Sequence, residues 1–381
     1  MTRPDPIGPQ RAAFNVPEDV AYFNTASLAP QLQAVRAAGE AALERRSRPW
    51  EISAADWFTD VERLRFLFAQ LVGSSPEAIA LVPATSYGFA VAARNLPLDA
   101  GRRVLVLAEE YPSGIYSWRA AARRSGAEVL TVSRESGQSW ADAVIAALDE
   151  RVAIVSVPNV HWTDGTFVDL GPISDRAREL GARLVIDASQ SLGAMPLDVG
   201  ELRPDFLVSV GYKWLLGPFG LGYLYVAEEH REGEPLEQNW IVRAGSEDFA
   251  GLVDYRDEYQ PGARRFDVGG RTKFELTPMA IAALEQIAEW EVPRIAATLT
   301  LRTSEIARRA AGLGLDPVPD EDRGPHMLGL RLPESARDGV LSALKARNCF
   351  AALRGSSLRV APHLHTTDED VERLFEGLAR V

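Results

Sequence analysis

Polar side chains follow four runs of apolar residues that have the length and composition of buried strands. The runs are AIALVPA, AIVSVPN, RLVIDAS and DFLVSVG. The side chains at or just after their ends supply an amine, a carboxylate, two amides and two hydroxyls: Lys213, Asp187, Asn159, Gln190, Thr85 and Ser86. In an open parallel sheet, ligands bind at the carboxyl ends of the strands. Each residue alone is more often a helix cap, a turn residue or a surface residue, but together they can serve one ligand.

This combination of groups is what pyridoxal 5′-phosphate (PLP) needs. An amine must form an imine with the cofactor, and burial and cationic neighbours lower its pKa for that step. A carboxylate must keep the pyridine nitrogen protonated so that the ring can accept electrons. Hydroxyls and N–H groups at a helix N-terminus suit the phosphate. We therefore predict that Lys213 holds PLP as a Schiff base, that Asp187 pairs with its ring nitrogen, and that Thr85 and Ser86 bind its phosphate.

The elements that position these residues alternate between strand-like and helix-like segments. Near-continuous Val, Ile and Leu runs separated by helices predict an α/β fold with a mostly parallel sheet covered on both faces. The predicted strands are 78–84, 103–109, 127–133, 153–159, 183–189, 205–211 and 221–227. The last strand follows its predecessor across a Gly/Pro connection too short for a helical crossover, which predicts an antiparallel strand. Predicted helices cover 31–47, 54–73, 116–126, 139–150 and 174–181, the last with Ser174 as its N-cap.

The chain divides into three parts. Residues 1–20 are rich in proline and polar groups and are predicted to form an arm. Residues 21–276 form the predicted large domain. Residues 277–381 contain an interdomain helix and a small α+β unit, and the bend at Pro293 is the expected hinge.

Composition excludes several classes of protein. The formal net charge is −12, from 41 basic and 53 acidic residues, and the basic pairs are scattered, so we expect no nucleic-acid partner. No stretch approaches 18 apolar residues and the N-terminus lacks a signal-peptide core, so we expect a cytoplasmic protein without a membrane partner. A single cysteine, Cys349, excludes an intramolecular disulfide and a cysteine-based metal cluster, and we expect no metal.

The motifs and their order resemble the fold-type I PLP enzymes of the class V aminotransferase group, which includes cysteine desulfurases, kynureninase and isopenicillin N epimerase. The resemblance runs from YFNTASLAP to LRVAPHLHTTDEDVERL, and its most specific parts are LVIDASQSLG, VGYKWLLGPFGLGYLYV and LRVAPHL. It implies the PLP transferase fold of type I: a large domain built on a mostly parallel, seven-stranded sheet, and a small α+β C-terminal domain.

The same resemblance implies roles for further residues. Gln190 and Asn159 would lie beside the cofactor's phenolic oxygen, although two extra residues in the following loop blur the register of Asn159. Tyr212, directly before the lysine, is similar to the phosphate-binding tyrosine of kynureninase. Tyr111, in EEYPSGIYSW, stands where relatives place a ring that stacks on the pyridine face.

Substrate and subunit contacts follow from the resemblance too. Arg359 would receive the α-carboxylate of an amino-acid substrate through two parallel hydrogen bonds. His161, with Trp162 and Asp164 in NVHWTDGTF, and Asn24 in YFNTASLAP are expected substrate-binding residues. The segment RRFDVGGRTKFEL resembles the part that reaches into a partner subunit, so Thr272 would complete the neighbouring phosphate site in a homodimer with active sites at the interface.

The fold does not choose the reaction. Desulfurases need a mobile-loop cysteine, whereas Cys349 lies in an apolar predicted strand, and buried thiols are inert. Persulfide-forming desulfuration is therefore disfavoured. Class V aminotransferase-like chemistry is favoured, with β- or γ-elimination including C–S lysis, epimerisation and kynureninase-like cleavage as alternatives; in most of them the freed Lys213 is the natural general base. PLP-sensing regulators carry a fused DNA-binding module, for which the N-terminal arm is too short.

Overall fold

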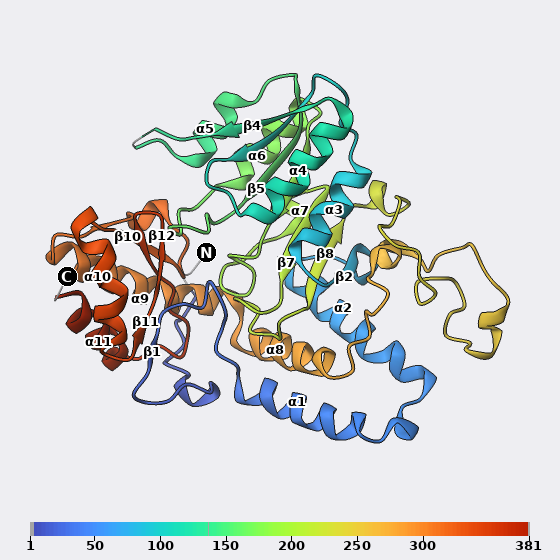
Figure 1. Ribbon diagram of the computed structural model, residues 1–381, viewed down its shortest axis with the longest axis horizontal. Coiled ribbons are helices and arrows are strands. Elements are labelled where there is room, and N and C mark those ends of the chain that lie inside the picture. The colour runs from blue at the N-terminus through green and yellow to red at the C-terminus, as the bar shows by residue number, and fades with distance from the viewer. Residues whose placement is uncertain (1–3, 136, 380–381) are drawn as a thin grey trace.

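The computed structural model describes residues 4–135 and 137–379. Seven strands form its central sheet: Ile79–Val82 (β2), Arg103–Leu107 (β3), Glu128–Val132 (β4), Val152–Pro158 (β5), Arg183–Asp187 (β6), Phe206–Val210 (β7) and Gly222–Val226 (β8). Their order across the sheet is β2-β8-β7-β6-β5-β3-β4 (Figure 1). All seven predicted strands are therefore confirmed.

Strand directions bring the functional ends together. The pairs β4–β3, β3–β5, β5–β6 and β6–β7 are parallel, and β8 is antiparallel to both β7 and β2. The predicted antiparallel strand at 221–227 is thus confirmed, because the short connection from β7 has no room for a crossover helix. Since β2 and β7 both oppose β8, they run the same way, and the carboxyl ends of β2, β7, β6, β5 and β3 share one edge.

Helices cover both faces of the sheet. Alternate side chains of β6 point to opposite faces, so Val185 joins one core, while Leu184 and Ile186 join the other. The first core packs under Thr85–Asn95 (α3) and Pro112–Ser125 (α4). The second packs under Thr59–Leu71 (α2), Trp140–Ala147 (α5), Leu170–Glu179 (α6) and Leu276–Trp290 (α8), with the long Gln33–Arg46 (α1) against α8.

The predicted start of the helix at 174–181 is wrong. We expected a helix from residue 174 with Ser174 as its N-cap, but α6 begins at Leu170 and Asp169 caps it by accepting a hydrogen bond from the Gly171 N–H. Gly171 and Pro172 suggested a loop in the sequence. Proline is nevertheless tolerated in the first turn of a helix, because the backbone N–H groups of that turn have no intrahelical partner. The Ser174 hydroxyl instead donates to the carbonyl of Leu202, in the short helix Val199–Leu202 (α7).

The C-terminal unit has its own sheet and core. The long helical region is interrupted at Glu291, which has a φ of 63°, and Val292–Gly312 (α9) carries Pro293 in its first turn. A four-stranded sheet, in the order β12-β13-β10-β9, packs against α9. The remaining elements are Asp316–Pro317 (β9), Leu328–Arg331 (β10), Glu334–Lys345 (α10), Cys349–Phe350 (β11), Ala352–Arg354 (β12), Ser357–Val360 (β13) and Asp368–Leu378 (α11).

The N-terminal segment joins this C-terminal unit. Ala21–Tyr22 (β1) pairs in parallel with β11, and Phe23 exchanges backbone hydrogen bonds with Phe350 and Ala361. Ala21 and Phe23 are fully buried in the core of the C-terminal unit. The division at residues 20 and 276 stays a prediction, but β1 lies against the C-terminal unit rather than against the large sheet. Among the described helices, none is both long enough and apolar enough to cross a membrane.

Candidate active site

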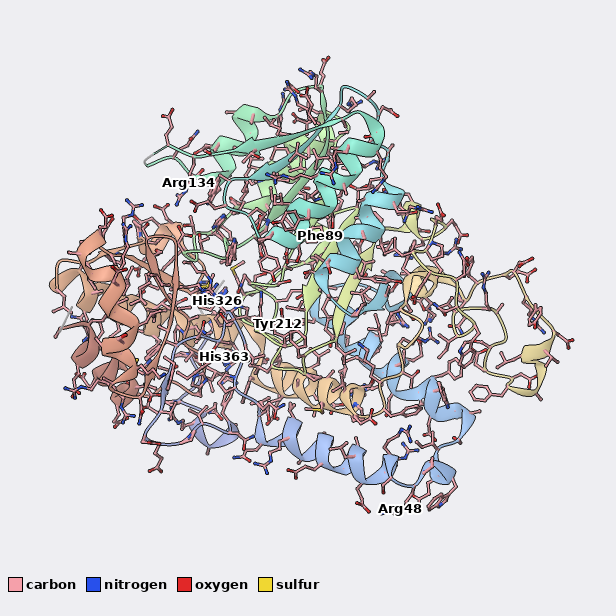
Figure 2. All side chains as sticks on the ribbon, in the orientation of Figure 1. Arg48, Phe89, Arg134, Tyr212, His326 and His363 are labelled. Carbon is pink, nitrogen blue, oxygen red and sulfur yellow. The ribbon has the colours of Figure 1, made fainter. Side chains whose placement is uncertain are left out.

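The site is built at the carboxyl ends of three adjacent strands. Asp187, the last residue of β6, is in register with Pro158 of β5 on one side and Val208 of β7 on the other. Asn159 directly follows β5, and Lys213 lies three residues beyond the end of β7. Figure 2 shows Tyr212 in the middle of the molecule, between the sheet and the C-terminal unit. The fold therefore brings the amine, the carboxylate and the amide to one edge.

Lys213 is a buried amine with aromatic neighbours. Its side chain is 7% exposed, and Nζ lies 5.3 Å from the ring centre of Tyr111 and 5.9 Å from that of Tyr212. Burial lowers the pKa of Lys213 to about 8, with Asp187 opposing the shift and Arg359 and Arg354 adding to it. A lysine with such a pKa has a substantial neutral fraction near pH 7 and can act as a nucleophile.

Asp187 is a carboxylate without a cation in contact. Its Oδ1 accepts a hydrogen bond from the Ser189 N–H at 2.9 Å, and among the described residues it forms no ion pair. Burial raises the pKa of Asp187, while its contact with Ser189 and the charge of Lys213 oppose this shift. Nearby, Asn159 Oδ1 and Ser189 Oγ are buried without a hydrogen-bond partner in the described chain. An uncompensated carboxylate and orphaned polar atoms fit a polar ligand with a cationic ring nitrogen.

The N-terminus of α3 points to the same edge. Thr85 and Ser86 are its first two residues; Thr85 is buried and Ser86 is exposed. Ala84 precedes them without a capping side chain, so the first N–H groups are left for a ligand. Gly88 lets the helix approach the sheet, because a Cβ there would lie 2.5 Å from Cγ1 of Val208 in β7. This close packing sets the helix end beside the strand that leads to Lys213.

An aromatic pair lines the next part of the site. Tyr111 precedes α4, and its ring meets the Trp162 ring edge-on at 5.6 Å. The Trp162 Nε1–H donates to the carbonyl of Glu109 at 2.6 Å, which fixes the indole. Tyr111 thus lies between Lys213 and Trp162, where a ring can stack on a flat ligand.

Arg359, in β13, is held by neutral acceptors. Its side chain is 1% exposed; Nη1 donates to the Trp162 carbonyl at 2.6 Å, and Nη2 donates to Ser27 Oγ at 2.7 Å and to Asn24 Oδ1 at 3.4 Å. Burial and the neighbouring Arg354 lower the pKa of Arg359 to about 9. A buried guanidinium without a carboxylate partner is suited to an anionic ligand.

Gln190 is placed behind this edge. Its Nε2 donates to the carbonyl of Ala26, and its Oε1 accepts from the indole of Trp214 at 2.9 Å. One amide hydrogen of Gln190 therefore remains for a ligand.

Two predicted residues are not brought into this group. Both ring nitrogens of His161 are engaged inside the protein, with Thr163 Oγ1 at 2.7 Å and the Ala108 carbonyl at 3.0 Å, and its ring stacks on Trp140. Thr272 donates its hydroxyl to the carbonyl of Trp57 in the same chain. A substrate contact by His161 has no support in this geometry, and the role of Thr272 in a partner's site stays a prediction.

Three residues near the site were missed by sequence reasoning. Ser27 and Arg354 both contact the Arg359 region, and their relation is visible only once the N-terminal segment and the β12–β13 hairpin are placed together. Glu110 follows β3 at the same edge; its Oε1 accepts the Tyr111 N–H at 2.6 Å, and its Oε2 is buried with no hydrogen-bond partner among the described residues. Burial, reinforced by the charge of Asp187, raises the pKa of Glu110 to about 8. Glu110 directly follows the predicted strand 103–109, and this position could have identified it as a candidate site residue.

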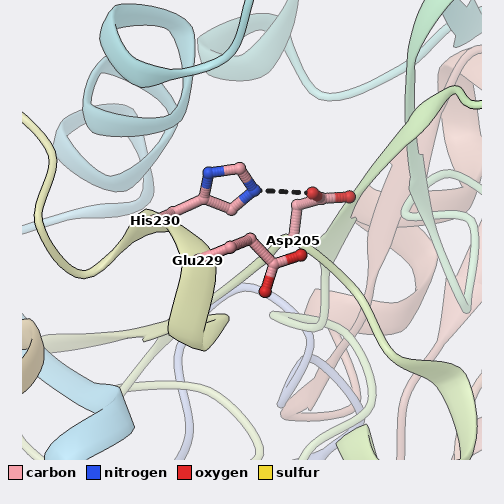
Figure 3. Close-up of side chains that lie close together, drawn as sticks. All are labelled: Asp205, Glu229 and His230. Atoms are coloured by element: carbon pink, nitrogen blue, oxygen red, sulfur yellow. Dashed lines mark hydrogen bonds and ion pairs between the residues drawn. The ribbon is translucent and has the colours of Figure 1, made fainter.

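A different polar group lies at the opposite edge of the sheet. Asp205, which directly precedes β7, contacts His230 at 2.6 Å, with Glu229 beside them (Figure 3). Among the described residues, Asp205, Glu229 and His230 place their potential ligand atoms within 4.8 Å of one another, close enough to hold a metal ion. Arg183 already supplies a positive charge, 3.1 Å from Asp205 and 3.7 Å from Glu229, so we assign the group a structural role.

Cys349 is a core residue, as predicted. It is 1% exposed in β11, and burial raises the pKa of its thiol to about 12. A thiol so far from ionisation and from solvent is a poor sulfur acceptor.

The sequence matches known proteins over most of its length. The family model described as Aminotransferase class-V matches residues 33–301. An uncharacterized aminotransferase of Bacillus subtilis (strain 168) is 27% identical, with 85% of each chain covered. The isopenicillin N epimerase of Streptomyces clavuligerus is 25% identical over 86% of this chain and 85% of its own. The kynureninase of Geobacillus thermodenitrificans (strain NG80-2) is 27% identical over 100% of this chain and 92% of its own.

Solved structures share the fold. A mutant of the cystine C–S lyase C-DES, with glycine covalently linked to its PLP cofactor, superposes with a TM-score of 0.88 at 19% identity, covering 98% of both chains. The apo cysteine desulfurase of Thermococcus onnurineus NA1 gives a TM-score of 0.83 at 19% identity, also covering 98% of both. The expected type I fold, with its seven-stranded sheet and smaller C-terminal sheet, is thereby confirmed.

Proposed function

This chain belongs to the class V aminotransferase family of PLP-dependent enzymes, and on that premise we propose that it transforms an amino acid with PLP attached to Lys213. The observation that carries the proposal is the shared strand edge: the buried amine of Lys213, the unpaired carboxylate of Asp187 and the open N-terminus of α3 meet there. Each of the three matches a different part of one cofactor.

Specific residues would hold PLP. Lys213 would bind the aldehyde carbon, Asp187 the ring nitrogen, and Asn159 and Gln190 the phenolic oxygen. Thr85, Ser86 and Tyr212 would hold the phosphate, and Tyr111 would cover the ring face. When bound, PLP withdraws electrons from the substrate's α-carbon into its pyridine ring.

The chain's own residues account for substrate handling. Arg359 would take the α-carboxylate through charge-assisted hydrogen bonds, since its buried Nε has no hydrogen-bond partner in the described chain. Asn24 and Ser27 hold the guanidinium in place. Lys213, once released from the cofactor, would accept the α-proton, since its pKa of about 8 allows the neutral form near pH 7.

For the reaction we propose class V aminotransferase-like chemistry. C–S lysis or other β-elimination, epimerisation and kynureninase-like cleavage are the competing reactions, since all use the same first steps. Persulfide-forming desulfuration stays disfavoured because the chain's one cysteine is buried in β11.

Reductive trapping tests the cofactor assignment. The chain has three lysines, Lys213, Lys273 and Lys345, so borohydride reduction of the PLP-loaded protein followed by peptide mapping identifies the attachment site. We expect modification of Lys213 and loss of the visible absorption band in Lys213→Ala. Lys273→Ala is the matched control, because burial lowers the pKa of Lys273 as well. Label on Lys273, or a colourless wild type in the presence of PLP, would contradict the proposal.

An amino-acid panel separates the reactions. Conversion of the cofactor to its pyridoxamine form indicates transamination, pyruvate with sulfide indicates C–S lysis, alanine from kynurenine indicates cleavage, and a racemised product indicates epimerisation. We expect a keto acid and the pyridoxamine form.

We further propose a homodimer with its active sites at the interface. Residues 236–259 project from the body of the molecule (Figure 1), and Val253 and Tyr255 at its end are 77% and 95% exposed. Thr272, in the segment that follows this projection, would reach the phosphate site of the second subunit. Sedimentation should give twice the chain mass of 41.6 kDa.

A further inference from the structure

Two arginines lie side by side near the site without an acidic partner. Arg354 ends β12, and Arg359 lies across the hairpin in β13. Both donate to the same hydroxyl, Ser27 Oγ, Arg354 at 3.3 Å and Arg359 at 2.7 Å. Their other acceptors are the carbonyls of Leu353 and Trp162 and the amide of Asn24, and among the described residues neither forms an ion pair.

Aromatic rings connect this pair to the reacting amine. The Arg354 guanidinium lies 5.7 Å from the Trp162 ring, which meets the Tyr111 ring at 5.6 Å, and Tyr111 is 5.3 Å from Lys213 Nζ. The charges of both arginines also reach Lys213, since each contributes to lowering its pKa. Arg354 therefore lies in the same cluster of side chains as Lys213, joined to it through Trp162 and Tyr111.

One substrate carboxylate would neutralise only one of the two positive charges of Arg354 and Arg359. A planar guanidinium binds a carboxylate with two parallel hydrogen bonds, so Arg359 alone satisfies an α-carboxylate. Arg359 is 1% exposed and has no counter-ion among the described residues, which is costly; burial lowers its pKa, and the positive charge of Arg354 adds to that shift. A second negative charge on the ligand would offset the charge of Arg354.

We propose that Arg354 binds a second anionic group on the substrate, so that the enzyme prefers amino acids with an acidic side chain: a carboxylate, sulfinate or sulfonate. This inference rests on the proposed function and names its substrate class. Arg359 is almost fully buried and would take the α-carboxylate, whereas Arg354 is only half-buried, at the hairpin turn beside Gly355, and can follow side chains of different lengths.

Ligand titrations of the PLP-loaded protein test the preference. Aspartate, glutamate and cysteate are compared with alanine and norvaline by calorimetry and by the visible absorption of the cofactor. In the wild type, we expect acidic amino acids to bind about 10- to 100-fold more tightly than neutral ones, the effect of one charge-assisted hydrogen-bonded pair. Aspartate against cysteate separates carboxylate from sulfonate recognition.

Variants assign the preference to a residue. Arg354→Gln should bring the ratio of acidic to neutral affinity close to one, and Arg354→Lys, which keeps the charge, should restore part of it. Arg331→Gln is the matched control, because Arg331 lies in the same sheet and is 74% exposed in a surface ion pair; it should leave the ratio unchanged. Thermal unfolding of each variant checks that the fold is intact.

Several outcomes would overturn the inference. These are a wild type without preference for acidic side chains, or an equal loss of affinity for all amino acids in Arg354→Gln, which would place Arg354 at the α-carboxylate or in the scaffold. The two proposals fail separately. A protein that carries PLP on Lys213 and shows no acidic preference keeps the proposed function and loses this inference. Acidic ligands that bind through Arg354 in a protein unable to take PLP would do the reverse.

Discussion

At the scale of single residues, burial drives the two principal groups toward their neutral forms. Burial lowers the pKa of Lys213 and raises the pKa of Asp187, which means that the protein alone destabilises the charged form of both side chains. A ligand with a cationic ring nitrogen would restore the charge of Asp187, and a covalent bond to Lys213 would remove the need to protonate it. The local electrostatics are thus arranged for a bound group.

Asp187→Asn should separate cofactor attachment from catalysis. The amide fits the same space but cannot stabilise a protonated ring nitrogen, so we expect kcat to fall about 100- to 10,000-fold. Reductive trapping should still find PLP on Lys213. A kcat within fivefold of the wild type would show that Asp187 does not govern the ring nitrogen.

Glu110→Gln should change how stability depends on pH. The folded pKa of Glu110 is about 8, above its ordinary 4.5, so its contribution to stability is complete below pH 4.5 and is lost as pH rises through 8. The variant should therefore lose less stability than the wild type between pH 6 and 9. The slopes of unfolding free energy against pH should differ between the wild type and Glu110→Gln by at most about 1.4 kcal/mol per pH unit, the value for one proton.

Denaturant unfolding at several pH values measures this slope. Glu109→Gln is the matched control because Glu109 is the adjacent, exposed acid. Identical slopes for wild type and Glu110→Gln would mean that Glu110 is ionised throughout.

Residues at strand ends were the predictable part of the site. Asp187, Asn159 and Lys213 each follow an apolar run, and a parallel sheet necessarily gathers such positions. Arg354 and Ser27 were not predictable, because more than three hundred positions separate them in the sequence and only the pairing of the first strand with the C-terminal unit joins them. His161 follows a strand as well, but its ring turns inward to Trp140, a choice of rotamer that sequence does not record.

At the scale of elements, the position of α3 depends on one glycine. In Gly88→Ala, the new Cβ would meet Val208 Cγ1 and push the helix away from β7. We expect a loss of about 1–3 kcal/mol in unfolding free energy, typical of overpacking, together with at least tenfold weaker PLP binding as the helix N-terminus moves. Chemical denaturation and PLP titration measure the two effects.

Gly339→Ala is the matched control for a helical glycine. It lies in α10, with nothing within 4 Å of the added Cβ, so it should stabilise the protein by about 0.5–1 kcal/mol and leave PLP binding unchanged. Similar effects of the two substitutions would show that close packing of α3 on β7 is unimportant.

Strands were predicted more accurately than helix starts. Continuous runs of Val, Ile and Leu define a buried strand by themselves, whereas a helix can begin with residues that also form turns. Gly171 and Pro172 hid the first turn of α6, and Pro112 begins α4 four residues before the predicted start. The break between α8 and α9 lies at Glu291 rather than Pro293, because proline fits inside the first helical turn.

At the scale of the whole molecule, three buried histidines lie where the two units meet: His326, His363 and His365. Figure 2 labels two of them between the sheet and the C-terminal unit. Trp214, next to Lys213, contacts the His326 ring edge-on at 4.3 Å, and Phe14 of the N-terminal arm packs on His363 and His365. Burial lowers the pKa of His326 and of His365 to about 4, and it also lowers the pKa of His363 well below its ordinary value.

These histidines should make the protein sensitive to acid. Their folded pKa values lie below the ordinary 6.5, so the unfolded chain binds more protons between pH 6.5 and 4, and stability present above pH 6.5 is lost as pH falls through that range. We expect His363→Phe to reduce the dependence, since neither ring nitrogen of His363 has a partner in the described chain and phenylalanine keeps the ring contacts. Thermal unfolding from pH 7 to 4.5 measures how stability falls with pH. If the stability of His363→Phe falls as steeply as that of the wild type, other groups cause the sensitivity to acid.

The parallel pairing of β1 with β11 has a consequence in time. A ribosome adding 5–20 residues per second needs about 15 to 65 seconds to go from the first of these strands to the second. During that interval Ala21 and Phe23, which end in a fully buried core, have nothing to pack against. The large sheet can fold while it is being synthesised, but the contacts of Arg359 with Asn24 and Ser27 form only when the last part of the chain has emerged. We therefore expect nascent chains halted before residue 349 to bind chaperones through their N-terminal segment, and full-length chains to release them.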